Sequence, residues 1–143
     1  RRISKGVDTI MREEQAGFRR GRGTTEHIHT LRNIIEQANE WNSNLYTCFI
    51  DYEKAFDCVH RKSLWNILRS YGIPEKIVTI IVALYTHTKC AVLGREGPSE
   101  SFDVLSGVKQ GCPLSGLLFI LVIDWIMKQT TGDARRGLQW TLH

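Results

Sequence analysis

The chain has 143 residues, of which 42% are hydrophobic and 24% are charged, and its formal net charge is +4. This composition is close to that of an ordinary globular domain and excludes a collagen-like or intrinsically disordered chain. The longest apolar run, Leu114 to Met127, includes Asp124. It is shorter than the roughly 20 residues that a membrane-spanning helix needs. We therefore expect a buried core helix at this run and no contact with a membrane.

The excess positive charge is confined to one end of the chain. Residues 1–35 contain eight basic and four acidic side chains, whereas the remaining residues contain equal numbers of each. Arginines are densest at Arg19, Arg20 and Arg22, beside Gly21. This pattern suits phosphate contact, because guanidinium groups donate paired hydrogen bonds and glycine lets the backbone approach. A solvated surface segment explains the same pattern about equally well.

The cysteines predict neither a metal site nor a disulfide framework. Cys48, Cys58, Cys90 and Cys112 include no C-x-x-C pair, and no Cys/His group has zinc-site spacing. We expect reduced, packed thiols in an intracellular protein, in either the nucleus or the cytoplasm.

The first half of the chain predicts two helices and one strand. A helix is expected from Thr24 or Thr25 to about Trp41, with four apolar residues on one face: Ile28, Leu31, Ile35 and Ala38. The run Leu45 to Ile50 predicts a buried strand that ends at Asp51. A second helix is expected from about Arg61 to Tyr71, ended by Gly72 and Pro74, with an inward face of Leu64, Ile67, Leu68 and Tyr71.

The second half predicts two more helices and a hairpin. One helix is expected from about Glu75 to Thr86, with five residues facing inward: Ile77, Ile80, Ile81, Leu84 and Tyr85. Strands are expected at Cys90 to Gly94 and Ser101 to Leu105, joined by a turn at residues 95–100. The loop Ser106 to Cys112 leads into an apolar helix from Pro113 to about Gln129. Helices and strands do not alternate strictly, so the predicted fold class is α+β.

Two segments carry residues suited to chemistry. Asp51 ends an apolar strand, where a carboxylate needs a partner. A Mg²⁺ ion is one such partner, while capping of the next helix or pairing with Lys54 or an arginine are others. In the second segment, Gly107 and Gly111 surround Gln110 just before a helix begins, so the backbone can approach a phosphate or a base. Taken alone, however, this loop is better explained as a tight connection from the hairpin to a core helix.

Three segments carry a resemblance when they are considered together. They are QAGFRRGRGTT at 15–25, FIDYEKAFD at 49–57 and GVKQGCPLS at 107–115. In this order they are similar to the fingers motif and the first two palm motifs of reverse transcriptases from non-LTR (LINE-type) retrotransposons. The resemblance covers about residues 13–130. Group II intron reverse transcriptases have similar motifs, but the KAFD string at 54–57 favours the retrotransposon type.

The resemblance implies a partial right-hand polymerase fold, with residues 1–44 mainly fingers and 45–143 mainly palm. It implies an RNA-directed DNA polymerase that uses two Mg²⁺ ions, an RNA template, a DNA primer and deoxynucleoside triphosphates. Two-metal catalysis of phosphoryl transfer needs carboxylates to hold the ions. Asp51 matches the first catalytic, metal-binding aspartate.

The resemblance also implies roles at the substrate. Phe56 matches the bulky residue under the sugar that disfavours a 2′-hydroxyl. Arg19 matches the contact to the incoming triphosphate, and the neighbouring Arg20 and Arg22 are expected to contact the template or phosphates. Gln110 and Gly111 match the loop near the nascent base pair. Asp57 is expected to be a cap or an ion-pair member.

The sequence departs from the family at two places. No Asp-Asp pair occurs, although the resemblance implies one after the Gln-Gly helix, and Asp133 is not part of such a pair. Gly116 stands where the family usually has proline. We expect the chain to be part of a longer polymerase, with residues 137–140 leading toward the absent hairpin and with no thumb. The alternatives are a catalytically inactive remnant that at most binds nucleic acid, or a decayed reading frame without a stable fold.

Overall fold

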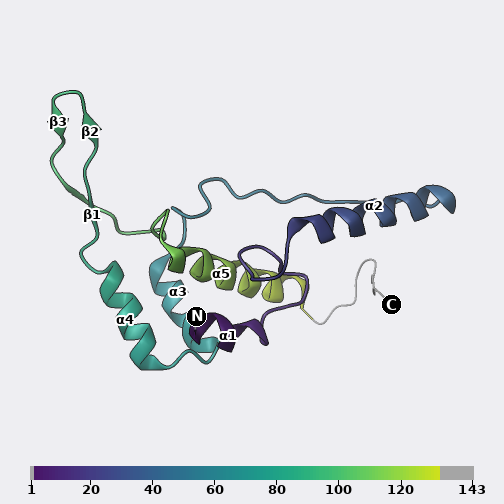
Figure 1. Ribbon diagram of the computed structural model, residues 1–143, viewed down its shortest axis with the longest axis horizontal. Coiled ribbons are helices and arrows are strands. Elements are labelled where there is room, and N and C mark those ends of the chain that lie inside the picture. Colours follow the sequence, from purple (N-terminus) through teal and green to yellow (C-terminus); the bar gives the residue numbers. More distant parts are fainter. Residues whose placement is uncertain (1, 133–143) are drawn as a thin grey trace.

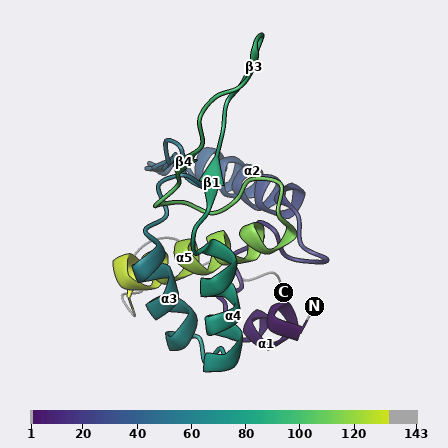
Figure 2. The same cartoon turned by 90° about the vertical axis from the view of Figure 1, so that its left-hand side faces the viewer.

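The computed structural model describes residues 2–132 of the chain (Figure 1). The helices in this range are α1 (Arg2–Asp8), α2 (Thr24–Glu40), α3 (Arg61–Ser70), α4 (Glu75–Tyr85) and α5 (Pro113–Thr131), and the strands are β1 (Lys89–Cys90), β2 (Leu93–Gly94), β3 (Gly97–Pro98) and β4 (Phe102–Asp103). Helices α1, α3, α4 and α5 gather into one body, from which α2 and the strands project (Figures 1 and 2). The predicted α+β mixture is confirmed.

The hydrophobic core lies where α3 packs against both α4 and α5. Leu68 of α3 and Leu118 and Leu121 of α5 are fully buried. Fully burying one leucine side chain stabilises a fold by about 2 kcal/mol relative to leaving it in water. The predicted inward face of α3 is confirmed, because every member is buried: Leu64, Ile67, Leu68 and Tyr71.

Both ends of α3 follow from local sequence. The helix begins after His60, whose ring nitrogen Nδ1 accepts a hydrogen bond from the Ser63 backbone N–H at 3.4 Å. It ends before Gly72, which has a left-handed φ of 71°. That conformation lets the Ile73 N–H donate to the Leu68 carbonyl at 3.1 Å, which satisfies an end of the helix. The predicted stop at Gly72 is therefore confirmed.

The predicted inward face of α4 is only partly right. Ile81 and Tyr85 are buried and Ile77 is half-buried, but Ile80 and Leu84 are 54% and 55% exposed. Helix α4 is apolar around most of its circumference. Hydrophobic spacing therefore did not single out the stripe that contacts α3.

Helix α5 is the central apolar element of the body. It ends at Thr131, slightly beyond the predicted Gln129, and its length and composition alone would allow it to cross a membrane. However, Leu118, Ile120 and Leu121 are packed in the core, and Asp124 is fully buried within a polar network. The prediction of a core helix is confirmed.

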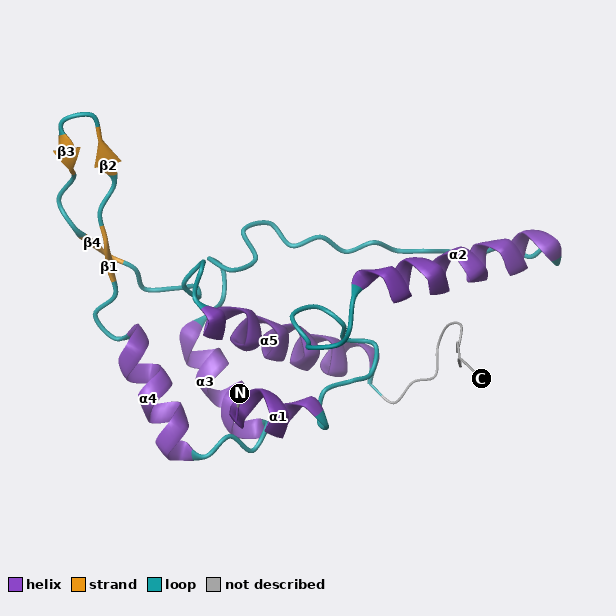
Figure 3. Cartoon of the chain, viewed as in Figure 1, coloured by secondary structure: helices purple, strands orange, loops and turns teal. Residues whose placement is uncertain are grey.

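The strands form one antiparallel hairpin with an irregular middle (Figure 3). β1 pairs with β4 and β2 pairs with β3, but two residues separate β1 from β2 whereas three separate β3 from β4. The extra residue makes a bulge, which interrupts the ladder. The two continuous strands predicted at Cys90 to Gly94 and Ser101 to Leu105 are therefore wrong in extent, although the hairpin itself is present.

The predicted buried strand at Leu45 to Ile50 is wrong in this structure. These residues have no regular structure, and Tyr46 and Phe49 are 90% and 81% exposed. A β-strand needs hydrogen-bonding partners on a neighbouring strand. The hairpin strands pair with each other, so none of residues 2–132 provides this segment with a partner.

The predicted helix at residues 24–41 is confirmed, but its apolar face is exposed. Helix α2 follows Gly23 as its N-cap, and Glu26 lies in its first turn as expected. None of its residues is buried, and Ile28 and Ile35 both face solvent. Helix α2 projects away from the helical body (Figure 1).

The remaining sequence predictions concern the cysteines and the residues beyond 132. The cysteines are free thiols, but Cys48, Cys58 and Cys90 are exposed, so the expectation of packed thiols is wrong for these three. The interpretation of Asp133 and the expectation for residues 137–140 lie outside the described residues.

Candidate active site

The two palm-like segments lie against each other. The Gly107 N–H donates to the Val59 carbonyl at 2.8 Å, and the Val108 N–H donates to the Phe56 carbonyl at 2.9 Å. Gly107 has a left-handed φ of 79°, and a Cβ atom there would lie 2.8 Å from the Asp57 Cα. Only glycine permits this approach. The glycine that opens the palm-like segment at 107–115 is therefore required for packing against the palm-like segment at 49–57.

Arg61 holds the approach to the Gln-Gly loop in place. Its guanidinium donates to the carbonyls of Gly107 at 3.0 Å and Ser106 at 3.0 Å. It also donates to the carbonyls of Val104 at 2.6 Å and Tyr85 at 3.1 Å, and it lies over the Tyr85 ring. The sequence did not predict this role, because an arginine that binds backbone carbonyls needs no particular partner side chains.

Phe56 lies at the centre of a cluster of three aromatic rings. It stacks on Phe119 of α5, with ring centroids 4.5 Å apart and planes 19° apart. Phe18, from the first motif, meets it edge-on, with centroids 6.0 Å apart at 74°. Phe56 is half-buried and packs against the hydrophobic core. Phe18 of the first segment and Phe119 of α5 therefore meet at the Phe56 ring, while Val108 of the third segment binds the Phe56 carbonyl.

Gln110 and Gly111 lie in an exposed turn beside the first palm-like motif. The Gln110 Nε2 donates to the Asp57 carboxylate, at 3.3 Å to Oδ1 and 3.5 Å to Oδ2. The partner of Asp57 is thus the amide of Gln110, rather than the helix end or cation expected from the sequence. Gly111 has a left-handed φ of 80° and lets the chain turn into α5.

Asp51 is exposed, and within residues 2–132 no hydrogen bond or ion pair joins its carboxylate to another residue. The capping and pairing alternatives for this carboxylate are therefore not realised in the structure. In the same range, no group of three or more His, Cys, Asp or Glu side chains could hold a metal ion. Asp51 offers a single accessible carboxylate, and the described residues alone do not fit a complete divalent-metal site.

The three arginines of the first motif have different environments. The Arg19 side chain is buried, and its Nε donates to the Asp8 carboxylate at 2.8 Å. Its other nitrogens donate to the backbone carbonyls of Arg12, Gln15 and Asp8. Arg20 is exposed, whereas the exposed Arg22 donates to the Glu13 carbonyl at 2.6 Å. Arg19 must exchange these bonds before it can contact a phosphate.

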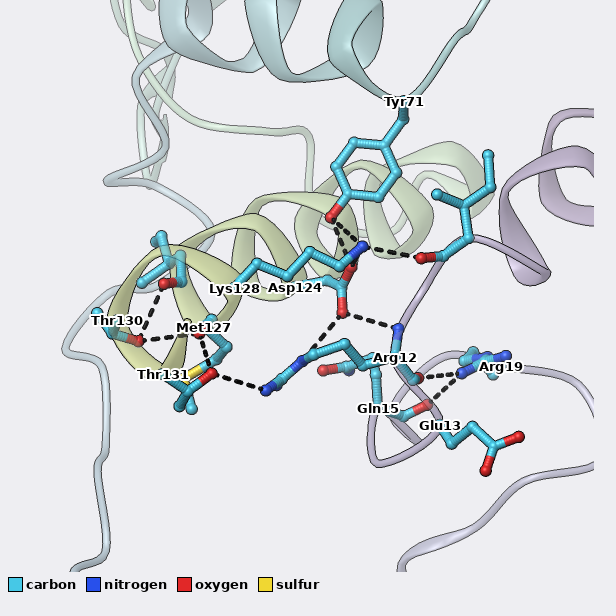
Figure 4. A network of polar contacts seen from close by, with 12 residues as sticks. Arg12, Glu13, Gln15, Arg19, Tyr71, Asp124, Met127, Lys128, Thr130 and Thr131 are labelled. Atoms are coloured by element: carbon cyan, nitrogen blue, oxygen red, sulfur yellow. Dashed lines mark hydrogen bonds and ion pairs between the residues drawn. The ribbon is translucent and has the colours of Figure 1, made fainter. Parts of the chain in front are cut away.

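A buried carboxylate ties the segment before the first motif to the core (Figure 4). Asp124 of α5 accepts hydrogen bonds from the Tyr71 hydroxyl at 2.5 Å and from the Arg12 backbone N–H at 3.1 Å. It also forms ion pairs with Lys128 Nζ at 2.9 Å and Arg12 Nε at 3.4 Å. A buried charge is tolerated when it is paired and hydrogen-bonded in this way. The sequence had marked Asp124 only as a polar interruption of an apolar run.

This network changes the acidity of its members. Burial alone would raise the pKa of Asp124, but hydrogen bonds from Tyr71, Lys128 and the Arg12 backbone outweigh it and lower that pKa. The pKa of Tyr71 is raised, first by burial and then by its bond to the Asp124 carboxylate. Asp124 is therefore ionised and Tyr71 neutral at neutral pH, which is the combination that the hydrogen bond requires.

Residues 1–142 match the family model described as reverse transcriptase (RNA-dependent DNA polymerase). The chain is 31% identical over 114 residues to the Retrovirus-related Pol polyprotein from type-2 retrotransposable element R2DM of Drosophila melanogaster, which covers 80% of this chain and 11% of that protein. It is 28% identical over 116 residues to the RNA-directed DNA polymerase from mobile element jockey of Drosophila funebris, covering 81% of this chain and 13% of that protein.

A Retrovirus-related Pol polyprotein from type-1 retrotransposable element R2 of Popillia japonica is 31% identical over 121 residues, which are 83% of this chain and 20% of that protein. The chain thus spans a fifth or less of the length of these relatives. The resemblance to reverse transcriptases of non-LTR retrotransposons is confirmed by these matches. The chain belongs to the reverse transcriptase (RNA-dependent DNA polymerase) family.

Proposed function

We propose that this chain forms the fingers and part of the palm of an RNA-directed DNA polymerase, whose activity belongs to a longer protein. The single observation that carries the proposal is the meeting of three distant motif segments at Phe56. Phe18 contacts its ring, the Val108 N–H binds its carbonyl, and Phe119 stacks on it. Such convergence is what a shared nucleotide site requires, because substrate groups must be oriented together.

The right-hand polymerase arrangement is part of this proposal, with residues 1–44 as fingers and 45–143 as palm. Residues 45–50 form no strand in this structure, and we propose that their exposed apolar side chains are covered in the longer protein. An apolar groove lined by residues of α3, α5 and the 52–60 segment supports this proposal, because partly buried apolar side chains of α5 such as Phe119, Val122 and Ile126 line it and are open to a covering layer. An apolar segment and an apolar groove that lack partners are stabilised once another layer covers them.

Each side chain of the site has a proposed role. Asp51 provides one carboxylate for a divalent metal, Mg²⁺ in the proposal, and further ligands come from outside residues 2–132. Phe56 lies under the sugar of the incoming nucleotide, and Gln110 and Gly111 lie beside the nascent base pair.

Arg19 contacts the triphosphate once its bonds to Asp8 are exchanged, while Arg20 and Arg22 contact the template or phosphates. The substrates are an RNA template, a DNA primer and deoxynucleoside triphosphates.

Primer extension by a longer protein that contains this chain tests the proposal. With an RNA template, a DNA primer and Mg²⁺, we expect extension by the unaltered protein and none by Asp51→Asn, which removes the carboxylate charge. Asp103→Asn is the matched control, because Asp103 is an exposed carboxylate on strand β4 of the hairpin and lies outside all three motif segments. Extension by Asp51→Asn at the control rate would refute the assignment of Asp51.

A second candidate function is nucleic-acid binding without catalysis. It is favoured by the exposed basic residues Arg20 and Arg22. The affinity of the 143-residue chain for single-stranded RNA should then fall steeply as salt rises, because phosphate contacts release counterions. Binding that does not depend on salt, or no binding at low salt, would reject this function.

A further inference from the structure

Phe18 has an unusual conformation for an aromatic residue. Its backbone φ is 54°, in the left-handed region that non-glycine residues rarely adopt, and its side chain is 67% exposed. An exposed phenylalanine in a strained backbone position is unfavourable on its own. We therefore expect the contacts of the Phe18 ring to offset this cost.

The ring of Phe18 occupies space that only glycine leaves open. A Cβ atom at Gly116 would lie 2.8 Å from Phe18 Cδ1 and 3.2 Å from Cγ. Gly116 lies within α5, where alanine would favour the helix more than glycine does. The glycine thus loses helix stability but admits the aromatic ring.

Phe18 and Phe119 contact Phe56 in different ways. Phe119 stacks on the Phe56 ring at 4.5 Å, whereas Phe18 approaches it edge-on at 6.0 Å and 74°. Both geometries are favourable for aromatic pairs. Phe119 and Gly116 both belong to α5. This helix therefore provides one neighbour of Phe56 directly and leaves space at Gly116 for the other, Phe18.

We propose that Phe18 is a positioning residue that holds the Phe56 ring in place, and that Gly116 is the glycine that allows it to do so. The pair thereby contributes to discrimination between deoxyribonucleotides and ribonucleotides. This inference rests on the proposed function of Phe56 as the residue beneath the sugar. It gives Gly116, where the family usually has proline, a specific reason in this chain.

The contact itself is tested by a double-mutant cycle on the 143-residue chain, without any activity measurement. Gly116→Ala should lower the thermal midpoint of the unaltered chain, because the new methyl group meets the Phe18 ring. In a Phe18→Ala background the same substitution should raise the midpoint, because alanine favours the helix and the ring is gone. Gly116→Ala chains that fail to fold while the double variant folds would also support the contact.

If Phe18→Ala itself does not fold, Phe18→Leu replaces it in the cycle, and the Gly116→Ala penalty should then shrink. Equal shifts of the midpoint in both backgrounds would overturn the proposal, whatever the enzyme does. This outcome would leave the proposed function untouched, because it concerns only the Phe18–Gly116 contact.

The role in selectivity is tested in the longer polymerase. The measured quantity is the ratio of kcat/KM for a deoxyribonucleotide to that for the matching ribonucleotide. Phe18→Ala and Gly116→Ala should each lower this ratio, by roughly 10-fold, and Phe56→Ala should lower it more. Phe102→Ala, which alters an exposed phenylalanine of the hairpin, is the control and should keep the ratio.

The two proposals fail in different ways in this experiment. A normal ratio in Phe56→Ala would refute the assignment of Phe56 and the present inference with it. A lowered ratio in Phe56→Ala, with an unchanged ratio in Phe18→Ala and Gly116→Ala, would refute the present inference alone. A purely structural role for Phe18 would lower both kcat/KM values together and leave their ratio unchanged.

Discussion

Two regions of the molecule contain similar apolar residues but differ in how far these are buried. One is the helical body around α3 and α5, and the other consists of α2, residues 43–55 and the hairpin. Leu68 and Leu118 are fully buried in the first region, whereas Tyr46, Phe49 and Leu93 in the second are more than four-fifths exposed. Both regions show the local patterns of helices or strands. The difference lies in partners, because an apolar stripe stabilises a fold only when another element covers it. Within residues 2–132, stability is therefore concentrated in the helical body.

The candidate site lies along the border between these regions. Phe56, Gly107 and Val108 are anchored to the body by hydrogen bonds and packing. Asp51, Arg20 and Gln110, in contrast, are exposed. The anchored residues set the shape of the site, and the exposed ones remain accessible to solvent.

The largest expected effect comes from truncating one leucine in each region. Leu68→Ala should lower the free energy of unfolding by about 3 kcal/mol, because it leaves a cavity in a packed core. Leu93→Ala should change it by less than about 0.5 kcal/mol, because the side chain is exposed. Chemical denaturation of the 143-residue chain measures both values. Equal losses would show that the two regions do not differ as described.

A somewhat smaller effect is expected for Asp124→Asn. The change should lower the free energy of unfolding at neutral pH by about 2 kcal/mol, because the charge that binds Lys128 and Arg12 is lost. The pKa of Asp124 is lowered in the folded chain, so the unfolded chain binds its proton at higher pH. The stability that Asp124 provides is therefore full above its ordinary pKa, near 4, and is lost as pH falls through the folded value.

Denaturation curves at several pH values distinguish the unaltered chain from Asp124→Asn. As the pH falls below about 5, the unaltered chain should lose stability more steeply than Asp124→Asn does. Asp103→Asn, at an exposed carboxylate, should follow the unaltered chain. Parallel curves for the unaltered chain and Asp124→Asn would show that the network does not hold the carboxylate in its ionised form.

A smaller loss is expected for Arg61→Lys, which keeps the charge but cannot reach four carbonyls at once. The free energy of unfolding should fall by about 1.5 kcal/mol, because the carbonyl of the buried Gly107 loses a donor. Lys62→Ala, at the exposed neighbour, should stay within about 0.5 kcal/mol of the unaltered chain. A loss no larger than that of the control would mean that Arg61 does not hold the loop.

The helices were predictable from the sequence because their signals are local. Periodic leucines and isoleucines, Gly72 and Pro113 placed α3, α4 and α5 within a few residues of their observed bounds. Burial was less predictable, since Ile80 and Leu84 have the right spacing but no element within residues 2–132 covers them. The segment at 45–50 shows the same limit, because strand propensity cannot supply a partner strand.

The site was predictable only in its motif residues. The three segments were recognisable by residue type and order, but the contacts that join them depend on tertiary structure. Arg61 binds backbone carbonyls, and Phe18 fits against a glycine nearly a hundred residues away. Neither contact has a local sequence pattern. The buried bonds of Arg19 were equally hidden, because a guanidinium suited to phosphate is also suited to carbonyl groups.

The central claim, that the motif segments converge on Phe56 at the edge of a stable body, is tested most directly by amide hydrogen exchange on the 143-residue chain. The account predicts slow exchange at the Gly107 and Val108 amides, which donate to the carbonyls of Val59 and Phe56. It predicts fast exchange at residues 45–50, which have no regular structure. Exchange at Gly107 and Val108 as fast as at residues 45–50 would contradict the claim.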